Sequence, residues 1–352
     1  MFDIDFYMSS YDYLKEMMDG KVRDKKSAID HLESLRNKES VIYNIETTNA
    51  CNMRCEMCPR TTMMTRPIET MSLDLFTKII GQIKPHKKEK WQEWEKFVHK
   101  TYGIKPTDMS ENHFFLYIIP KVIQLHGYGD PLLDRNMALF VKMLADRGFY
   151  SYFSCNPANI DIERTVEMFQ SGLDYIKYSI ESVDDKRHKE IRGSASDFTD
   201  SYNKILKILD IKKEKGFKTT IIITMLDLNK DWQKEDFNKL KEMFKGKDVY
   251  IYMKSEDQQW YREDYHGTNS VHWSEFCKHP WMSMTIKSNG EAAMCMEDYN
   301  NEIVLGDASK ESLYEIWNGK KYEQFRRDHF DLKKGLKCSE ECDMHLIGEK
   351  VK

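Results

Sequence analysis

Three cysteines in the segment 51–58 have the spacing of an iron–sulfur ligand set. Three residues separate Cys51 from Cys55, and two separate Cys55 from Cys58. Three thiolates on one short loop bind three irons of a four-iron, four-sulfur cluster and leave the fourth iron open for chemistry. A structural zinc site is the alternative, but it needs a fourth Cys or His nearby, and none follows before His86.

A predicted strand precedes this loop, and predicted helices and strands alternate after it. These elements would position the loop. Residues 41–47 predict a strand, and Ser72 is the expected N-cap of a helix that ends near residue 83. Further strands are predicted at 122–126, 150–154, 175–180, 219–224 and 249–253, with helices at 137–147, 162–171, 202–215 and 234–244. Six alternating strands predict an α/β fold, a partial (β/α)6 TIM-like barrel, whose active site gathers at the C-terminal strand ends.

Composition narrows the class of protein. The 352 residues include 54 basic and 58 acidic side chains with a net charge of -4, so no global field favours nucleic acid or an anionic membrane. No apolar run is long enough to span a membrane, and the first residues do not form a signal peptide, so we expect a cytoplasmic protein. In a reducing compartment, eight cysteines favour metal ligation over disulfides.

With two further motifs, the cysteine loop resembles the radical S-adenosylmethionine (radical SAM) enzymes. Gly127-Tyr128-Gly129-Asp130-Pro131 is similar to the family's Gly-Gly-Glu-Pro segment, with Tyr128 inserted and Asp in place of Glu, and residues 177–193 are similar to its ribose and carboxylate contacts. The residue before the third cysteine, commonly aromatic in the family, is Met57. The resemblance implies that the open iron binds S-adenosylmethionine. It assigns cofactor contacts to Met57, Gly127, Gly129, Asp130, Asn156, Ser179, Glu181 and Arg192.

Four more cysteines lie in the C-terminal part. Cys277 and Cys295 flank a hairpin predicted around Asn289-Gly290, and Cys338 and Cys342 follow a predicted helix. Four thiolates suit either a zinc site or a fully ligated iron–sulfur cluster. The whole pattern resembles the SPASM module or its shortened twitch form, as in the dehydrogenase of butirosin biosynthesis, and this resemblance implies an auxiliary 4Fe-4S cluster.

Two segments fall outside the resemblance. The first 40 residues predict helices, and residues 84–120 form an insertion in which Trp91, Trp94 and Val98 have helical spacing. The insertion either caps the substrate or packs on the outside. We therefore expect a helical extension at 1–40, a radical SAM barrel at 41–265, and an auxiliary-cluster domain at 266–352 after a linker at 266–269.

The resemblance implies reductive cleavage of S-adenosylmethionine to a 5′-deoxyadenosyl radical, with electrons from a donor such as flavodoxin or ferredoxin. A second, fully ligated cluster has no open iron for substrate but accepts an electron. This predicts oxidation of a small polar molecule, such as a sugar or aminocyclitol. The alternatives are a peptide-modifying maturase that installs a crosslink, thioether or epimerised centre, and a noncatalytic metal scaffold.

Five residues are candidates for catalysis. Tyr128, Asp227, Lys254 and Glu256 lie at predicted strand ends, where each is able to accept a proton or anchor substrate. Cys155 belongs to neither cysteine set and is expected to be a buried core residue. If instead it faces the deoxyadenosyl group, its thiol would return a hydrogen atom to the radical and make the enzyme an epimerase.

Overall fold

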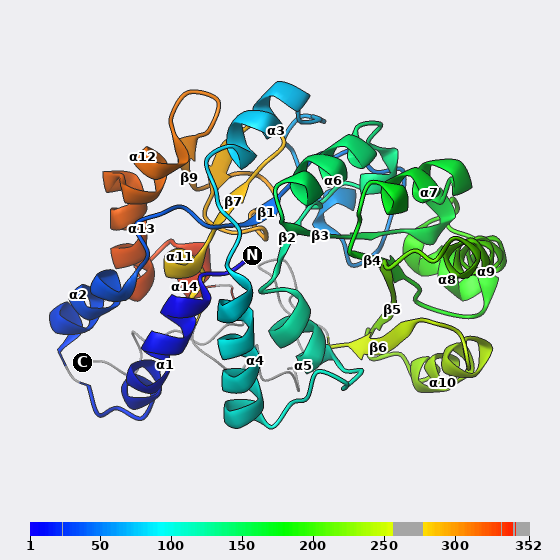
Figure 1. The fold of residues 1–352 in the computed structure, drawn as a ribbon, viewed down its shortest axis with the longest axis horizontal. Helices are drawn as coiled ribbons and strands as arrows, with labels where there is room; N and C mark the ends of the chain where they lie inside the picture. The colour runs from blue at the N-terminus through cyan, green and yellow to red at the C-terminus, as the bar shows by residue number, and fades with distance from the viewer. Residues whose placement is uncertain (23, 256–276, 332, 341, 343–352) are drawn as a thin grey trace.

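Six parallel strands form the predicted barrel sheet. This computed structural model describes residues 1–22, 24–255, 277–331, 333–340 and 342. Neighbouring strands pair in sequence order. They are β1 (Ile42–Ile45), β2 (Val122–Gln124), β3 (Tyr150–Cys155), β4 (Tyr175–Ser179), β5 (Thr220–Leu226) and β6 (Tyr250–Lys254). The predicted partial (β/α)6 arrangement is confirmed, and the C-terminal ends of these strands meet at one edge of the sheet (Figure 1).

Helices follow the strands in the predicted order. They are α3 (Leu73–Ile80), α6 (Met137–Asp146), α7 (Ile162–Gln170), α8 (Asp185–Arg192), α9 (Phe198–Lys215) and α10 (Gln233–Met243). Side-chain caps fix several starts; the hydroxyl of Ser72, for example, accepts the backbone N–H of Leu75 at 3.2 Å. Helix α8 was not predicted. It is almost entirely charged and buries only His188 and Ile191, so it has no apolar periodicity to reveal it.

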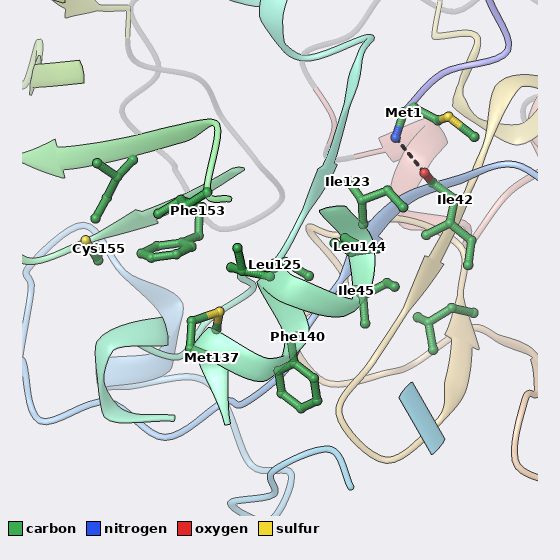
Figure 2. Close-up of a cluster of buried hydrophobic side chains, with 14 of the residues drawn as sticks. Met1, Ile42, Ile45, Ile123, Leu125, Met137, Phe140, Leu144, Phe153 and Cys155 are labelled. Carbon is green, nitrogen blue, oxygen red and sulfur yellow. Dashed lines mark hydrogen bonds between the residues drawn. The ribbon is translucent and has the colours of Figure 1, made fainter. Parts of the chain in front are cut away.

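A hydrophobic core joins these helices to the sheet. Figure 2 shows Ile123, Leu125 and Phe153 of the strands packed near Phe140 and Leu144 of α6. All five side chains are fully buried. Because side chains alternate across a strand, the residues between them in sequence face the inside of the barrel, where the site lies.

The N-terminal helices and the insertion form a second core. Helices α1 (Ile4–Met18), α2 (Lys25–Leu35), α4 (Lys88–Tyr102) and α5 (Glu111–His113) lie on the opposite side of the strands from α3 and α6 (Figure 1). The indole of Trp94 donates a 2.6 Å hydrogen bond to the carbonyl of Leu116 and packs edge-to-face on Tyr7. A π-helical turn at Phe114–Ile118 continues from α5 toward the barrel interior. Helix α4 of the insertion packs on α1, and Phe114, Phe115 and Ile119 line the cavity described below. That the insertion caps a substrate stays a prediction.

The C-terminal part extends the same sheet. Strand β7 (Met284–Ile286) pairs in parallel with β1, and β8 (Glu291–Ala293) and β9 (Val304–Asp307) continue antiparallel to give nine strands in the described residues. The predicted hairpin is present, and Gly290 has a φ of 92°, which favours glycine. Helices α11 (His279–Met282), α12 (Leu313–Asn318), α13 (Lys320–Phe330) and α14 (Lys337–Glu340) pack beside these strands. The predicted linker at 266–269 lies outside the described residues.

No helix in the described part of the chain combines the length and apolar character that a membrane crossing requires.

Candidate active site

The first cysteine loop is held by backbone hydrogen bonds to the end of α8. The N–H of Arg54 donates to the carbonyl of Arg192 at 3.1 Å, and the N–H of Glu56 donates to that of Ile191 at 2.9 Å. Burial, with a smaller contribution from the neighbouring thiols, raises the pKa of Cys51 to about 11 and that of Cys58 to about 12. A thiol must lose its proton to bind a metal, so binding of a cluster at this loop would release protons.

The four C-terminal cysteines converge from separate elements. Cys277 precedes α11, Cys295 follows β8, Cys338 lies in α14, and Cys342 follows that helix. Burial, with smaller contributions from the other three thiols, raises the pKa of the Cys338 thiol well above its usual value. Among the described residues, no three Cys, His, Asp or Glu side chains are grouped as ligands of one metal ion.

Both cysteine sets line the same cavity. Its volume is about 360 Å³, and its wall includes all seven predicted cluster ligands. Thiolates that bind different irons of a cluster need not converge on one point, so this arrangement fits two iron–sulfur clusters at the walls of one chamber. The seven ligand candidates are Cys51, Cys55, Cys58, Cys277, Cys295, Cys338 and Cys342.

Most of the predicted S-adenosylmethionine contacts line this cavity as well. They are Met57, Gly127, Asp130, Asn156, Ser179, Glu181 and Arg192. Glu181 binds the guanidinium of Arg192 and accepts the N–H of Leu226 at 2.8 Å, which fixes a carboxylate and a cation beside Cys55. A carboxylate, a guanidinium and a hydroxyl are the groups that recognise an amino acid and a ribose, so the donor set fits this cosubstrate.

The carboxylate of Asp130 accepts several hydrogen bonds from the protein itself. Its carboxylate accepts the N–H groups of Leu132 at 3.0 Å and Asn156 at 3.1 Å, and the amide of Asn159 at 2.8 Å. Burial raises its pKa above the usual value, although these donors oppose the rise. The carboxylate therefore also organises the turns that follow β2 and β3.

The two glycines of the second motif make room for protein atoms. A Cβ on Gly127 would lie 2.2 Å from Oε2 of Glu46, and one on Gly129 would lie 2.2 Å from the carbonyl oxygen of Thr48. Gly129 is not among the residues that line the cavity in the described part of the chain. Both glycines thus pack closely against residues that follow β1, and the contacts of Gly127 and Gly129 with the cofactor stay a prediction.

The five catalytic candidates have different surroundings. Tyr128 and Lys254 line the cavity, and the Tyr128 hydroxyl donates to Oε2 of Glu297 at 2.8 Å. Asp227 does not line it within the described residues; its carboxylate accepts the N–H of Asn229 at 2.9 Å in the turn after β5. Glu256 lies outside the described residues.

Cys155 also lines the cavity, but it packs mainly in the core. It is 6% exposed, and its thiol lies 3.7 Å from the backbone carbonyl of Lys177 on the neighbouring strand. Figure 2 shows it near Phe153. Burial raises the pKa of its thiol well above the usual value. These surroundings are those of a small core residue.

Sequence reasoning missed several polar residues of the cavity wall, among them His126, Lys177 and Glu297. The available signal was Lys177, a charged residue inside an otherwise β-forming strand two positions before Ser179. A buried parallel strand rarely carries a lysine without a reason.

Comparison with known proteins identifies two regions of the chain. Residues 45–241 match the model of the radical SAM superfamily, and residues 277–343 match that of an iron-sulfur cluster-binding domain named SPASM. A search of curated proteins gave no match.

The fold is similar to several solved structures. Native anSMEcpe with bound AdoMet (S-adenosylmethionine) has a TM-score of 0.52 and 13% identity, covering 85% of this chain and 88% of that one. Streptococcus suis SuiB bound to S-adenosylmethionine has a TM-score of 0.51 and 13% identity, covering 90% and 76%. BtrN in complex with AdoMet and 2-DOIA has a TM-score of 0.44 and 16% identity, covering 81% and 85%. At these identities the likeness concerns the fold.

A radical SAM domain carries a 4Fe-4S cluster and uses S-adenosylmethionine, and a SPASM domain carries auxiliary iron–sulfur clusters. The expected cofactors are therefore confirmed at the level of the family. The radical SAM match spans more than half of the 352 residues, so the chain belongs to the radical SAM superfamily and carries a C-terminal SPASM domain.

Proposed function

We propose that this enzyme oxidises a small polar substrate by removing two hydrogens from a carbon–oxygen unit. The observation that supports the proposal most strongly is that both cysteine sets line one cavity. A substrate in this cavity would lie within reach of both cofactor sites.

When bound, the cofactors supply a 5′-deoxyadenosyl radical that takes a hydrogen atom from the substrate and an auxiliary cluster that accepts the remaining electron. The chain must hold the substrate and accept one proton. We assign the first cluster to Cys51, Cys55 and Cys58, and the auxiliary cluster to the four C-terminal cysteines. Glu181 and Arg192 orient S-adenosylmethionine beside Cys55. Tyr128 and Lys254 are the candidate proton acceptors that line the cavity.

The substrate thus loses one hydrogen atom, one proton and one electron, and a hydroxyl-bearing carbon becomes a carbonyl. The proton is able to leave only if a polar group is close to the hydroxyl oxygen. Phe114, Phe115 and Ile119 belong to the apolar part of the wall, which would shield the radical from water. A low-potential donor such as flavodoxin or ferredoxin would supply the electron that starts the reaction.

The test is turnover by anaerobically reconstituted protein with S-adenosylmethionine, dithionite and candidate sugars, aminocyclitols and sugar acids in deuterated water. Oxidation predicts 5′-deoxyadenosine and a product two hydrogens lighter than the substrate, without solvent deuterium on carbon. Cys295→Ala should lower the amount of product formed per 5′-deoxyadenosine, because the auxiliary electron acceptor is lost. Cys155→Ala is the matched control and should keep the wild-type ratio.

Two outcomes contradict this reaction. A product with the composition of the substrate except that one carbon-bound hydrogen is replaced by deuterium, with this labelled product lost in Cys155→Ala, would identify an epimerase. A peptide that stimulates 5′-deoxyadenosine formation and is itself modified, while every small molecule fails, would identify a peptide maturase.

A further inference from the structure

A buried lysine lies beside the loop that carries Cys295. Lys287 follows β7 directly and is 0% exposed. Its ammonium group donates a 2.9 Å hydrogen bond to the carbonyl of Met296, the residue after Cys295, and lies 5.8 Å from the centroid of the Tyr128 ring. Lys287 is not among the described residues that line the cavity. In that part of the chain it therefore lies beside an auxiliary-cluster ligand and not beside the substrate.

The neighbours of Lys287 keep its side chain charged. Burial lowers the pKa of this lysine, and the charge of Arg66 lowers it further, whereas the charge of Glu46 opposes the decrease. The charges of Asp298 and Cys295 oppose it as well. Lysine is almost never fully buried unless its charge is paired. Acidic groups on two sides supply this pairing, so Lys287 is an ammonium ion within the protein.

Glu46 does not belong to Lys287 alone. Its carboxylate, which is also 0% exposed, accepts a 2.5 Å hydrogen bond from the guanidinium of Arg66 and a 3.1 Å hydrogen bond from the hydroxyl of Ser288. The N–H of Tyr128 donates to the same carboxylate at 3.2 Å. One negative charge thus faces two positive charges, those of Arg66 and Lys287. The positive charge of Lys287 is therefore only partly balanced by Glu46.

The second acidic neighbour belongs to the loop after Cys295. Asp298 is 1% exposed, and its carboxylate accepts the N–H groups of Glu302 at 2.9 Å and Ile303 at 3.0 Å. This loop therefore contains a buried anion as well as the carbonyl that binds Lys287. The two buried charges have opposite signs and lie near the same cluster ligand, which makes their effects separable by experiment.

A fixed charge near an iron–sulfur cluster changes the affinity of that cluster for an electron. Reduction adds negative charge, and the reduction potential depends on nearby net charge, hydrogen bonds and solvent exposure. A buried charge is screened far less than one at the surface, so its effect extends over several ångströms. Lys287 should therefore stabilise the reduced form, and Asp298 should destabilise it.

We propose that Lys287 raises the reduction potential of the auxiliary cluster and makes it a better electron acceptor. The inference deepens the proposed function, and its catalytic consequence rests on that function. The substrate radical loses one electron, which the auxiliary site accepts, and one proton, which a polar group of the cavity wall accepts. Lys287 neither gives nor takes a proton in this step. It is a positioning residue that acts through the cluster.

The test measures the midpoint potential of the auxiliary cluster by an anaerobic redox titration monitored by electron paramagnetic resonance. Full-length protein with Cys51, Cys55 and Cys58 replaced by alanine gives the signal of the auxiliary cluster alone, and the holoenzyme is titrated in parallel. Lys287→Met should lower the equilibrium constant for uptake of one electron by about tenfold, which is about 59 mV. In the holoenzyme one of the two couples should move by the same amount.

Three further variants separate charge from structure. Lys287→Gln keeps a donor for the carbonyl of Met296 but is neutral, so it should lower the potential as Lys287→Met does. Lys287→Arg keeps the charge and should move the potential by less than half as much. Asp298→Asn removes the neighbouring negative charge and should move the potential in the opposite direction. A purely structural role of these buried side chains does not predict opposite shifts.

Lys142→Met is the control, because Lys142 lies on the exposed face of α6 and pairs with Asp146. It should keep the wild-type potential. Iron content and thermal unfolding confirm that each variant is folded and carries its cluster. If Lys287→Met does not bind iron, Lys287→Gln and Asp298→Asn decide the outcome.

The inference is overturned if the neutral variants of Lys287 keep the wild-type potential or raise it, if Lys287→Arg shifts it as much as Lys287→Gln, or if Asp298→Asn lowers it. Turnover is scored separately. A lowered potential in Lys287→Gln together with a wild type that oxidises no substrate would refute only the proposed reaction. Oxidation by the wild type together with an unchanged potential in Lys287→Gln would refute the inference alone.

Discussion

The guanidinium of Arg192 bridges the carboxylate of Glu181 and the sulfur of Cys55. Its Nη1 lies 3.6 Å from the sulfur, and its ion pair with Glu181 is buried, with side-chain exposures of 16% and 1%. Burial by itself would lower the pKa of Arg192, but the charges of Glu181 and Cys55 outweigh it and raise that pKa. One side chain thus connects the end of α8, the residues after β4 and the first cysteine loop.

Removing this guanidinium should be costly for folding. Arg192→Met leaves the Glu181 carboxylate buried without its cation, and breaking a buried pair in this way costs about 3–5 kcal/mol. Chemical denaturation of the variant measures the loss. The exposed pair of Lys142 and Asp146 provides the control, since Lys142→Met should change stability by no more than about 1 kcal/mol. Equal effects in both variants would show that the buried pair does not anchor the loop.

All three cysteines of the first loop should be required to bind the first of the two clusters. Replacing Cys51, Cys55 or Cys58 by Ala should lower the iron content of anaerobically reconstituted protein from about eight to about four atoms per chain. Formation of 5′-deoxyadenosine should be lost in the same variants. Cys155→Ala should keep the full iron content, because Cys155 packs in the core. Purification of the wild type with zinc in both sites would contradict the assignment of both cysteine sets.

Replacing either glycine after β2 by alanine should lower stability, and the two losses should differ. In Gly127→Ala the new Cβ meets the side chain of Glu46, whereas in Gly129→Ala it meets the backbone carbonyl of Thr48, each at 2.2 Å. A side chain is able to shift more readily than a backbone. We therefore expect both variants to lose stability by about 1–3 kcal/mol, with Gly129→Ala losing more.

Thermal unfolding of the two glycine variants, measured side by side, checks this order. Glu46 is itself held by Arg66 at 2.5 Å, so Gly127→Ala should also disturb that ion pair. A Gly129→Ala variant as stable as the wild type would contradict the close packing of Gly129 against the backbone of Thr48.

The pH dependence of stability should contain a contribution from Asp174. Burial raises the pKa of this carboxyl to about 6, although its hydrogen bonds from Ser151 oppose the rise. A folded-state pKa above the unfolded value stabilises the protein at low pH, and this stabilisation is lost as pH rises through about 6. The amide oxygen in Asp174→Asn still accepts the Ser151 N–H, which donates at 2.8 Å in the wild type, but this side chain does not titrate.

Denaturation of Asp174→Asn and wild type from about pH 4 to about pH 7 tests this sign. The variant should gain stability relative to the wild type as pH rises. Asp146→Asn, at an exposed position on α6, is the control and should show a smaller pH-dependent difference. A relative loss for Asp174→Asn with rising pH would contradict the prediction.

The sequence alone determined the family and the order of strands and helices. Both depend on local spacing: Cys51, Cys55 and Cys58 carry their chemistry within one loop, and apolar periodicity distinguishes strands from helices. Apolar periodicity did not predict α8, because nearly all of its residues are charged. It also did not predict that β7 pairs with β1.

Only the tertiary structure shows which side chains line the cavity. Strand register brings His126, Ser154 and Lys177 to one level, and it places Cys155 against the backbone of Lys177 in the core. It also brings Phe114, from an insertion outside every motif, over the ammonium group of Lys177. Register depends on how whole strands pair across the sheet, and no stretch of sequence encodes it locally. The sequence therefore identified the cofactors, and only the fold showed which side chains line the cavity.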